Sequence, residues 1–160
     1  MEWFVKAFLK ASLAWLAAGV ALGVAMAVHP MWTVYRLAHV HMLLLGFVTM
    51  MIYGVAYHVI PRFSGHSLRS RGAARVHWWL SNLGLAAMAC GFCWRVWSPE
   101  RGTWLLGGGG TLSALGAYLF VWIMWSTMDG ARTRTASTQQ GGATTTGAGA
   151  TVPLTRRTMS

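Results

Sequence analysis

Long apolar runs constrain most strongly what this chain can fold into. A helix rises about 1.5 Å per residue and needs roughly 20 apolar residues to cross the hydrocarbon core of a membrane. The sequence holds four runs near that length, at residues 9–28, 38–60, 76–97 and 103–128. Hydrophobic residues make up 55% of the chain and charged residues only 10%, which excludes an ordinary soluble domain. We therefore predict an all-α integral membrane protein, a four-helix bundle formed by residues 1–128.

The basic residues give the chain a net charge of +10, and their distribution indicates the kind of surroundings. A nucleic-acid-binding surface gathers them in one patch, whereas here they fall in separate groups beside the apolar runs. The larger groups are Lys6 and Lys10, then Arg62, Arg69, Arg71 and Arg75, then Arg132, Arg134, Arg156 and Arg157 in the tail. Because basic residues mark the cytoplasmic side, we expect a multi-pass protein of a bacterial inner membrane. Both termini would lie in the cytoplasm, with lipid and not nucleic acid as the partner.

Three further features complete the outline of the chain. Residues 129–160 are rich in Gly, Ser and Thr, which predicts a disordered polar C-terminal tail. Gly109, Ser113 and Ala117 recur at a spacing that lets neighbouring helices approach closely. Cys90 and Cys93 share one helix face without a second cysteine pair, and we interpret them as packing residues.

Histidines mark both ends of the second run. His39 and His41 lie near its outer end, and His29 lies across the first connection. His58 lies near the inner end, at the same depth as His77 at the start of the third run. A polar side chain inside a bilayer is costly and usually faces the bundle interior. The direction in which each histidine points is therefore informative.

The helical period of about 100° per residue separates His39 from His41. The residues that share the face of His39 are Gly46, Met50, Tyr53 and Tyr57. Those that share the face of His41 are aliphatic, namely Leu45, Val48, Ile52, Val55 and Val59. We interpret the His39 face as the interior. Gly46, with no side chain, would let a flat ring system approach the backbone there.

Two stretches carry a family resemblance. "HVHMLLLGFVTMMIYGVAYHVIPRFSG" and the later "ARVHWWLSNLGL" resemble the second and third helices of haem–copper oxidase subunit I, in the style of the C-type oxidases and nitric-oxide reductases. The resemblance covers about residues 8–128, the N-terminal four helices of that longer subunit. It implies that His39 is an axial ligand of a low-spin haem. His41 is the alternative, because a gap in the helix would transfer the role to it.

The resemblance also implies a limit on activity. In that family the copper ligands, the active-site haem ligand and the second axial ligand come from later helices, so we do not expect oxygen reduction by this chain alone. We predict a membrane protein that binds b-type haem and is linked to respiratory electron transfer or nitric-oxide metabolism, as a homo-oligomer or a subunit of a respiratory complex. The sixth ligand would come from His41, His29, a symmetry mate or nothing. Arg36 would neutralise a haem propionate.

Two other hypotheses remain open. The chain is alternatively a cofactor-free accessory or assembly subunit of a terminal oxidase or nitric-oxide reductase. Imidazole and thioether groups also suit monovalent copper, and "HVHM" lies near Met26 and Met31. His58 and His77 are weaker candidates for a second haem, a quinone or a proton-transfer role.

Overall fold

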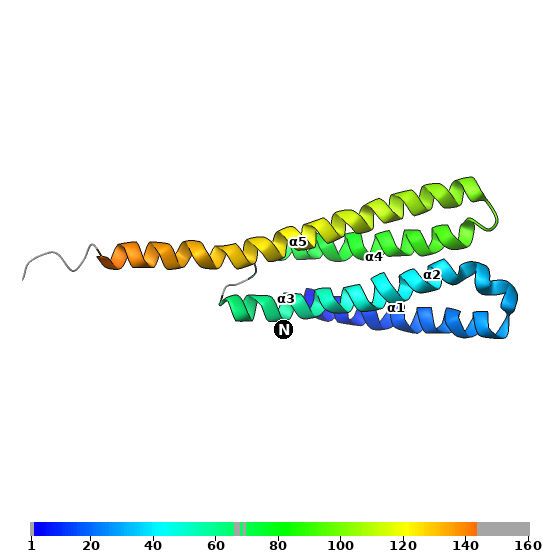
Figure 1. Ribbon diagram of the computed structural model, residues 1–160, viewed down its shortest axis with the longest axis horizontal. Helices are drawn as coiled ribbons and strands as arrows, with labels where there is room; N and C mark the ends of the chain where they lie inside the picture. Colours follow the sequence, from blue (N-terminus) through cyan, green and yellow to red (C-terminus); the bar gives the residue numbers. More distant parts are fainter. Residues whose placement is uncertain (1, 66–67, 69, 144–160) are drawn as a thin grey trace, which may run out of the picture.

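The computed structural model describes residues 2–65, 68 and 70–143, with side chains as far as residue 129. Helices hold 93% of these described residues, and no strand occurs among them. The helices form two antiparallel hairpins that lie side by side (Figure 1). The prediction of an all-α fold is confirmed.

The first hairpin consists of one long helix and a returning rod of three helical segments. The long helix ends where His29 takes an extended conformation, with φ of −120°, before a 3₁₀ turn that begins at a proline. The rod ends at Gly65, whose φ of 68° is the left-handed conformation that glycine adopts without strain. In chain order the elements are α1 (Trp3–Val28), η1 (Pro30–Tyr35), α2 (Arg36–His41), η2 (Met42–Thr49) and α3 (Met50–Ser64).

The middle segment of the rod, η2, is a π-helix of eight residues. In a π-helix each backbone amide bonds five residues back, which changes the number of residues per turn. The side chain of Thr49 follows the same spacing, because its hydroxyl donates to the carbonyl of Leu44 at 2.9 Å. The sequence had suggested one uninterrupted α-helix for the second run. The rod is instead interrupted by this π-helix.

The second hairpin consists of α4 (Arg71–Trp94) and α5 (Pro99–Ala143). The hydroxyl of Ser70 caps α4 by accepting a hydrogen bond from the amide of Ala73 at 3.2 Å. A short connection after Trp94 reverses the direction of the chain. The helix α5 begins at Pro99, and a proline is well suited to this position because the first amide of a helix has no intrahelical acceptor.

Glycines let α4 and α5 touch backbone to backbone. A Cβ added to Gly109 of α5 would lie 2.7 Å from the carbonyl oxygen of Gly84 on α4. A Cβ on Gly84 would in turn lie 2.7 Å from the amide nitrogen of Ser113. The expectation that Gly109 and Ser113 allow close helix approach is confirmed. Gly107, Gly108 and Gly110 behave differently, because a Cβ on any of them meets nothing within 4 Å.

Three helices are long and apolar enough to cross a membrane: Trp3–Val28, Pro30–Ser64 and Pro99–Asp129. They contain the first, second and fourth runs found in the sequence. The third run forms α4, which ends at Trp94 and falls short in hydropathy. Its first half carries two arginines, His77, Ser81 and Asn82. Two of these polar side chains are buried, so they face the bundle and lower the hydropathy of the helix without facing outward.

Most apolar side chains of the spans lie on the outside of the molecule. In the most apolar stretch of α1 only 11% of the residues are buried, and in that of α5 only 17%. A soluble protein rarely exposes large contiguous apolar surfaces, so this outer surface indicates apolar surroundings. The buried core is correspondingly small, and its members are Phe4, Val5, Phe8, Met50, Tyr57, Ala74, Leu85, Ile123 and Met124.

The first part of the predicted polar tail lies among the described residues. The structure continues α5 through Ala143, beyond Met128, where the last span was expected to end. No proline interrupts residues 100–143, so the helical hydrogen-bond ladder continues past the apolar segment. Residues 144–160 of the expected tail lie outside the described residues.

Candidate functional site

The facing predicted for the second run is confirmed by burial. On the expected inner face Gly46, Met50 and Tyr57 are buried. On the expected outer face Val48, Ile52 and Val55 are all exposed, and Ile52 is the most exposed at 56%. The facing of His39 and His41 does not follow from the burial of residues further along the rod, because the π-helix begins directly after His41.

His39 lies in a notch of α1 where Gly23 has no side chain, beside the carbonyl group of Gly19. Its Nδ1–H donates to the carbonyl oxygen of Gly19 at 2.8 Å. A Cβ added to Gly23, one turn further along α1, would lie only 2.8 Å from the Cε1 atom of the ring. The ring is half-buried, and its Nε2 atom has no hydrogen-bond partner among the described residues. Because a carbonyl only accepts, this bond fixes the proton on Nδ1 and leaves a lone pair on Nε2.

His41 points to the other hairpin. Its Nδ1–H donates to the carbonyl of Leu37 on its own helix at 2.8 Å, and its ring centroid lies 4.8 Å from that of Phe92 on α4. His29 is exposed and packs against Trp32, with 5.6 Å between the ring centroids. The three outer histidines therefore have three different neighbours. The structure does not bring His39 and His41 together as ligands of one metal.

Gly46 lies where neighbouring helices approach closely. A Cβ there would lie 2.6 Å from Cβ of Trp15 on α1 and 2.9 Å from Cδ2 of Leu85 on α4. The missing side chain thus makes room for neighbouring helices, and no space remains beside it for a flat ring system. Arg36 is exposed at the start of α2, one turn before His39.

At the opposite end of the bundle, His58 and His77 have separate partners. The guanidinium of Arg62 donates to Nε2 of His58 at 2.6 Å, one turn along the same helix. His77 is 0% exposed, and its Nδ1 shares a hydrogen bond of 2.9 Å with the hydroxyl of Tyr57. The two histidines do lie near the same end, as predicted, because Tyr57 directly precedes His58.

Four aromatic rings surround His77. The shortest centroid distances from its ring are 4.5 Å to Tyr53 and 4.9 Å to Phe8, and Phe120 lies at 5.5 Å. Tyr57 completes this aromatic cage at 5.8 Å. Nε2 of His77 is buried without a hydrogen-bond partner among the described residues. Buried polar atoms are nearly always paired, so the unpaired Nε2 of His77 is an unusual feature of the core.

Sequence reasoning missed this cage. It placed His77 only by its depth, at the level of His58, whereas the structure buries its side chain completely. The available signal was the spacing of His77, Ser81 and Gly84, which puts a polar and small-residue stripe on one face of α4. The aromatic walls come from α1, α3 and α5, and no local pattern links them.

Among the described residues, no group of three or more His, Cys, Asp or Glu side chains is placed to hold a metal ion. Haem needs fewer ligands, and it is the cofactor that the resemblance implies. His39 fits one axial ligand, because its Nδ1–H is held by a carbonyl as in many metal-ligating histidines. The packed region beside Gly46 does not fit a haem enclosed within the first hairpin. The described chain thus supplies an oriented ligand without an internal cavity beside it.

The comparisons with known proteins add no family. Neither a scan against protein-family models nor a search of the curated proteins found a match to this chain. The likeness to haem–copper oxidase subunit I therefore depends on the residues quoted above.

Proposed function

We propose that this chain is a membrane protein that binds b-type haem through Nε2 of His39, at a contact with a second protein surface. The observation that carries the proposal is the hydrogen bond between His39 Nδ1–H and the Gly19 carbonyl. It fixes the tautomer and the ring direction, which are the two properties that a metal-ligating histidine needs from its surroundings. Bound haem would supply a redox-active iron, which suits respiratory electron transfer or nitric-oxide metabolism.

The second surface follows from the packing at His39. The interior beside Gly46 is filled, whereas the His39 ring is only half-buried at the edge of the hairpin. A haem on Nε2 would therefore be covered from outside the chain. A second copy is the simplest cover, because a two-fold axis would also bring a second His39 and its neighbours to the same site. A different subunit of a respiratory complex is the alternative cover.

In the proposed topology all four long helices cross the membrane. α4 contacts α5 backbone to backbone through Gly84 and Gly109, so it shares the surroundings of α5 despite its lower hydropathy. The ion pair between Arg71 and Glu2 (3.0 Å) places the start of α4 beside the N-terminus. Arg75 lies 5.5 Å above the ring of Trp3 at the same end. These basic residues favour a cytoplasmic location for that end, in the inner membrane of a bacterium.

The test of haem binding is a reduced-minus-oxidised visible spectrum of the protein purified in detergent from haem-producing cells. We expect a haem spectrum in the wild type, its loss in His39→Ala, and its retention in His41→Ala. His41→Ala is the matched control, because it removes an imidazole two residues away on the same rod. The haem-to-chain ratio distinguishes a second copy of the chain from a different subunit as the covering surface, since a haem shared across a two-fold axis gives one haem per two chains.

Two results would contradict the proposal. One is a wild-type protein without haem, and the other is a His39→Ala variant that keeps haem at the wild-type ratio. Circular dichroism and size-exclusion chromatography check that each variant remains folded. The packing of Trp15 against Gly46 favours a second candidate function, the cofactor-free accessory subunit, because it leaves no room for a prosthetic group beside that glycine. A haem-free wild type would support that function.

A further inference from the structure

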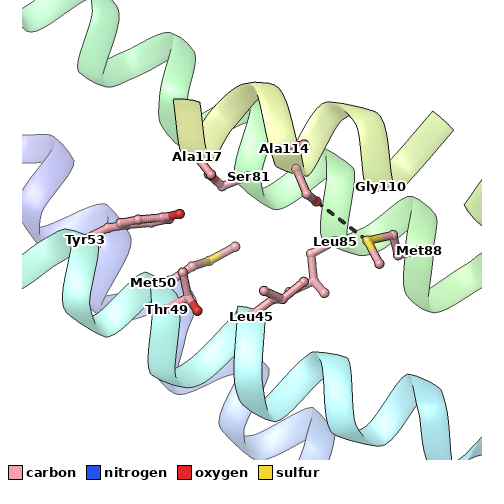
Figure 2. A pocket seen from close by; sticks show the side chains of 11 residues that line it. Leu45, Thr49, Met50, Tyr53, Ser81, Leu85, Met88, Gly110, Ala114 and Ala117 are labelled. Carbon is pink, nitrogen blue, oxygen red and sulfur yellow. Dashed lines mark hydrogen bonds between the residues drawn. The ribbon is translucent and has the colours of Figure 1, made fainter. Parts of the chain in front are cut away.

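A cavity of about 260 Å³ lies between the two hairpins. Figure 2 shows the rod of the first hairpin on one side of it, and α4 and α5 on the other. Its α5 wall is made of small residues, Gly110, Ser113, Ala114 and Ala117, which leave room that larger side chains would fill. Protein interiors are close-packed, so a cavity of this size is not an ordinary packing gap.

Hydroxyl groups line this cavity, and two of them are unpaired. The hydroxyl of Thr49 donates to a carbonyl of its own helix, and that of Ser113 donates to the sulfur of Met88 at 3.8 Å. The hydroxyls of Tyr53 and Ser81 have no hydrogen-bond partner among the described residues, although Ser81 is only 7% exposed. Figure 2 shows the Tyr53 ring reaching from α3 toward Ser81 on α4.

The two unpaired hydroxyls mark one end of the cavity. Tyr53 also contacts the caged His77, and Ser81 lies one turn beyond His77 on α4. The opposite end is lined by apolar side chains, including Leu45 and Met88. Among the side chains that the structure describes, no charged one lines the cavity. An ionised ligand would lose its hydration without compensation, so the lining favours a neutral occupant.

We propose that the cavity binds a small neutral molecule with an apolar body and one carbonyl or hydroxyl oxygen. The oxygen lies between Tyr53 and Ser81, where both hydroxyls bond to it, and the apolar body lies toward Leu45 and Met88. Pockets for small molecules commonly combine a mostly apolar lining with a few polar groups that fix orientation. The site does not include His39, so it stands or fails independently of haem binding.

The first test uses 4-fluorophenol as the probe and follows its ¹⁹F resonance while the detergent-solubilised protein is titrated, with empty micelles subtracted. We expect saturable binding to the wild type. Ala114→Phe places a ring in the cavity and should weaken binding at least tenfold. The matched control is Leu115→Phe, the next residue on α5, whose side chain is 54% exposed on the outer surface. This control should bind like the wild type.

The second test separates hydrogen bonding from apolar filling. Tyr53→Phe and Ser81→Ala should each weaken 4-fluorophenol binding about fivefold, since one neutral hydrogen bond contributes about 1 kcal/mol. Fluorobenzene, which lacks the hydroxyl, should bind both variants like the wild type. If Ala114→Phe fails to fold, Ala117→Leu fills the same cavity.

The proposal is overturned if the wild type shows no saturable binding of 4-fluorophenol. Equal binding to the wild type and to a folded cavity-filling variant would also overturn it. Equal losses for both probes in Tyr53→Phe and Ser81→Ala would overturn the assigned role of the two hydroxyls.

Discussion

Gly109→Ala should destabilise the folded protein by about 2 kcal/mol, although alanine is ordinarily the better helix former. The added methyl group would lie 2.7 Å from the carbonyl oxygen of Gly84 and 2.7 Å from the amide nitrogen of Met88. Both atoms belong to the backbone of α4, so no side-chain rotation can relieve the overlap. The two helices must separate, and the contacts along the whole hairpin weaken.

Gly108→Ala is the control, one residue earlier on the same helix. A Cβ there meets nothing within 4 Å, so only helix propensity changes. We expect this variant to be more stable than the wild type by about 0.5 to 1 kcal/mol. Equilibrium unfolding followed by circular dichroism in one detergent measures both differences. If the two variants shift stability in the same direction, α4 and α5 are not packed backbone to backbone.

Tyr57→Phe should lower the free energy of unfolding by about 2 kcal/mol, because it removes the one hydrogen-bond partner that the fully buried imidazole has among the described residues. His77→Phe leaves the Tyr57 hydroxyl unpaired but also removes the unsatisfied Nε2 atom, so its cost should be nearer to 1 kcal/mol. The double variant removes every polar group of the pair. We expect it to be more stable than Tyr57→Phe alone, since an apolar pair leaves nothing unsatisfied.

The double-mutant cycle measures this coupling by the same unfolding assay. Tyr53→Phe is the matched control, because the Tyr53 ring also contacts His77 but the two side chains share no hydrogen bond. Its effect on stability should be small and additive with that of His77→Phe. Additive costs for Tyr57→Phe and His77→Phe would show that the hydrogen bond does not contribute to the core as described.

The long apolar helices could be predicted because their signal is local. Length and composition located three spans, and the helical period identified Gly46 and Met50 as buried and Ile52 as exposed. The third run was harder to interpret, because its buried polar residues lower its hydropathy below that of the three longer apolar helices. Its lower hydropathy reports packing against α5, which only the arrangement of the helices reveals.

The candidate sites depend on contacts between distant segments, and here the sequence was less informative. The facing argument selected His39 as the candidate ligand. Its partners were sought near Gly46, whereas its contacts in the structure are with Gly19 and Gly23 on α1. Those two glycines are four residues apart, a spacing that a search of α1 for notches would have found. The cage of His77 joins residues from four helices, and no periodicity within one helix indicates it.

The π-helix at Met42–Thr49 divides the returning rod into two parts with different rotational phase. A uniform α-helix would rigidly couple the direction of His39 to that of the inner tyrosines. The wider turns between them release this coupling, so His39 faces the glycine notch of α1 while Tyr53 and Tyr57 contact His77 of α4. A single apolar rod thereby directs His39 toward α1 and its inner tyrosines toward α4, so a substitution that reorients one end need not disturb the other.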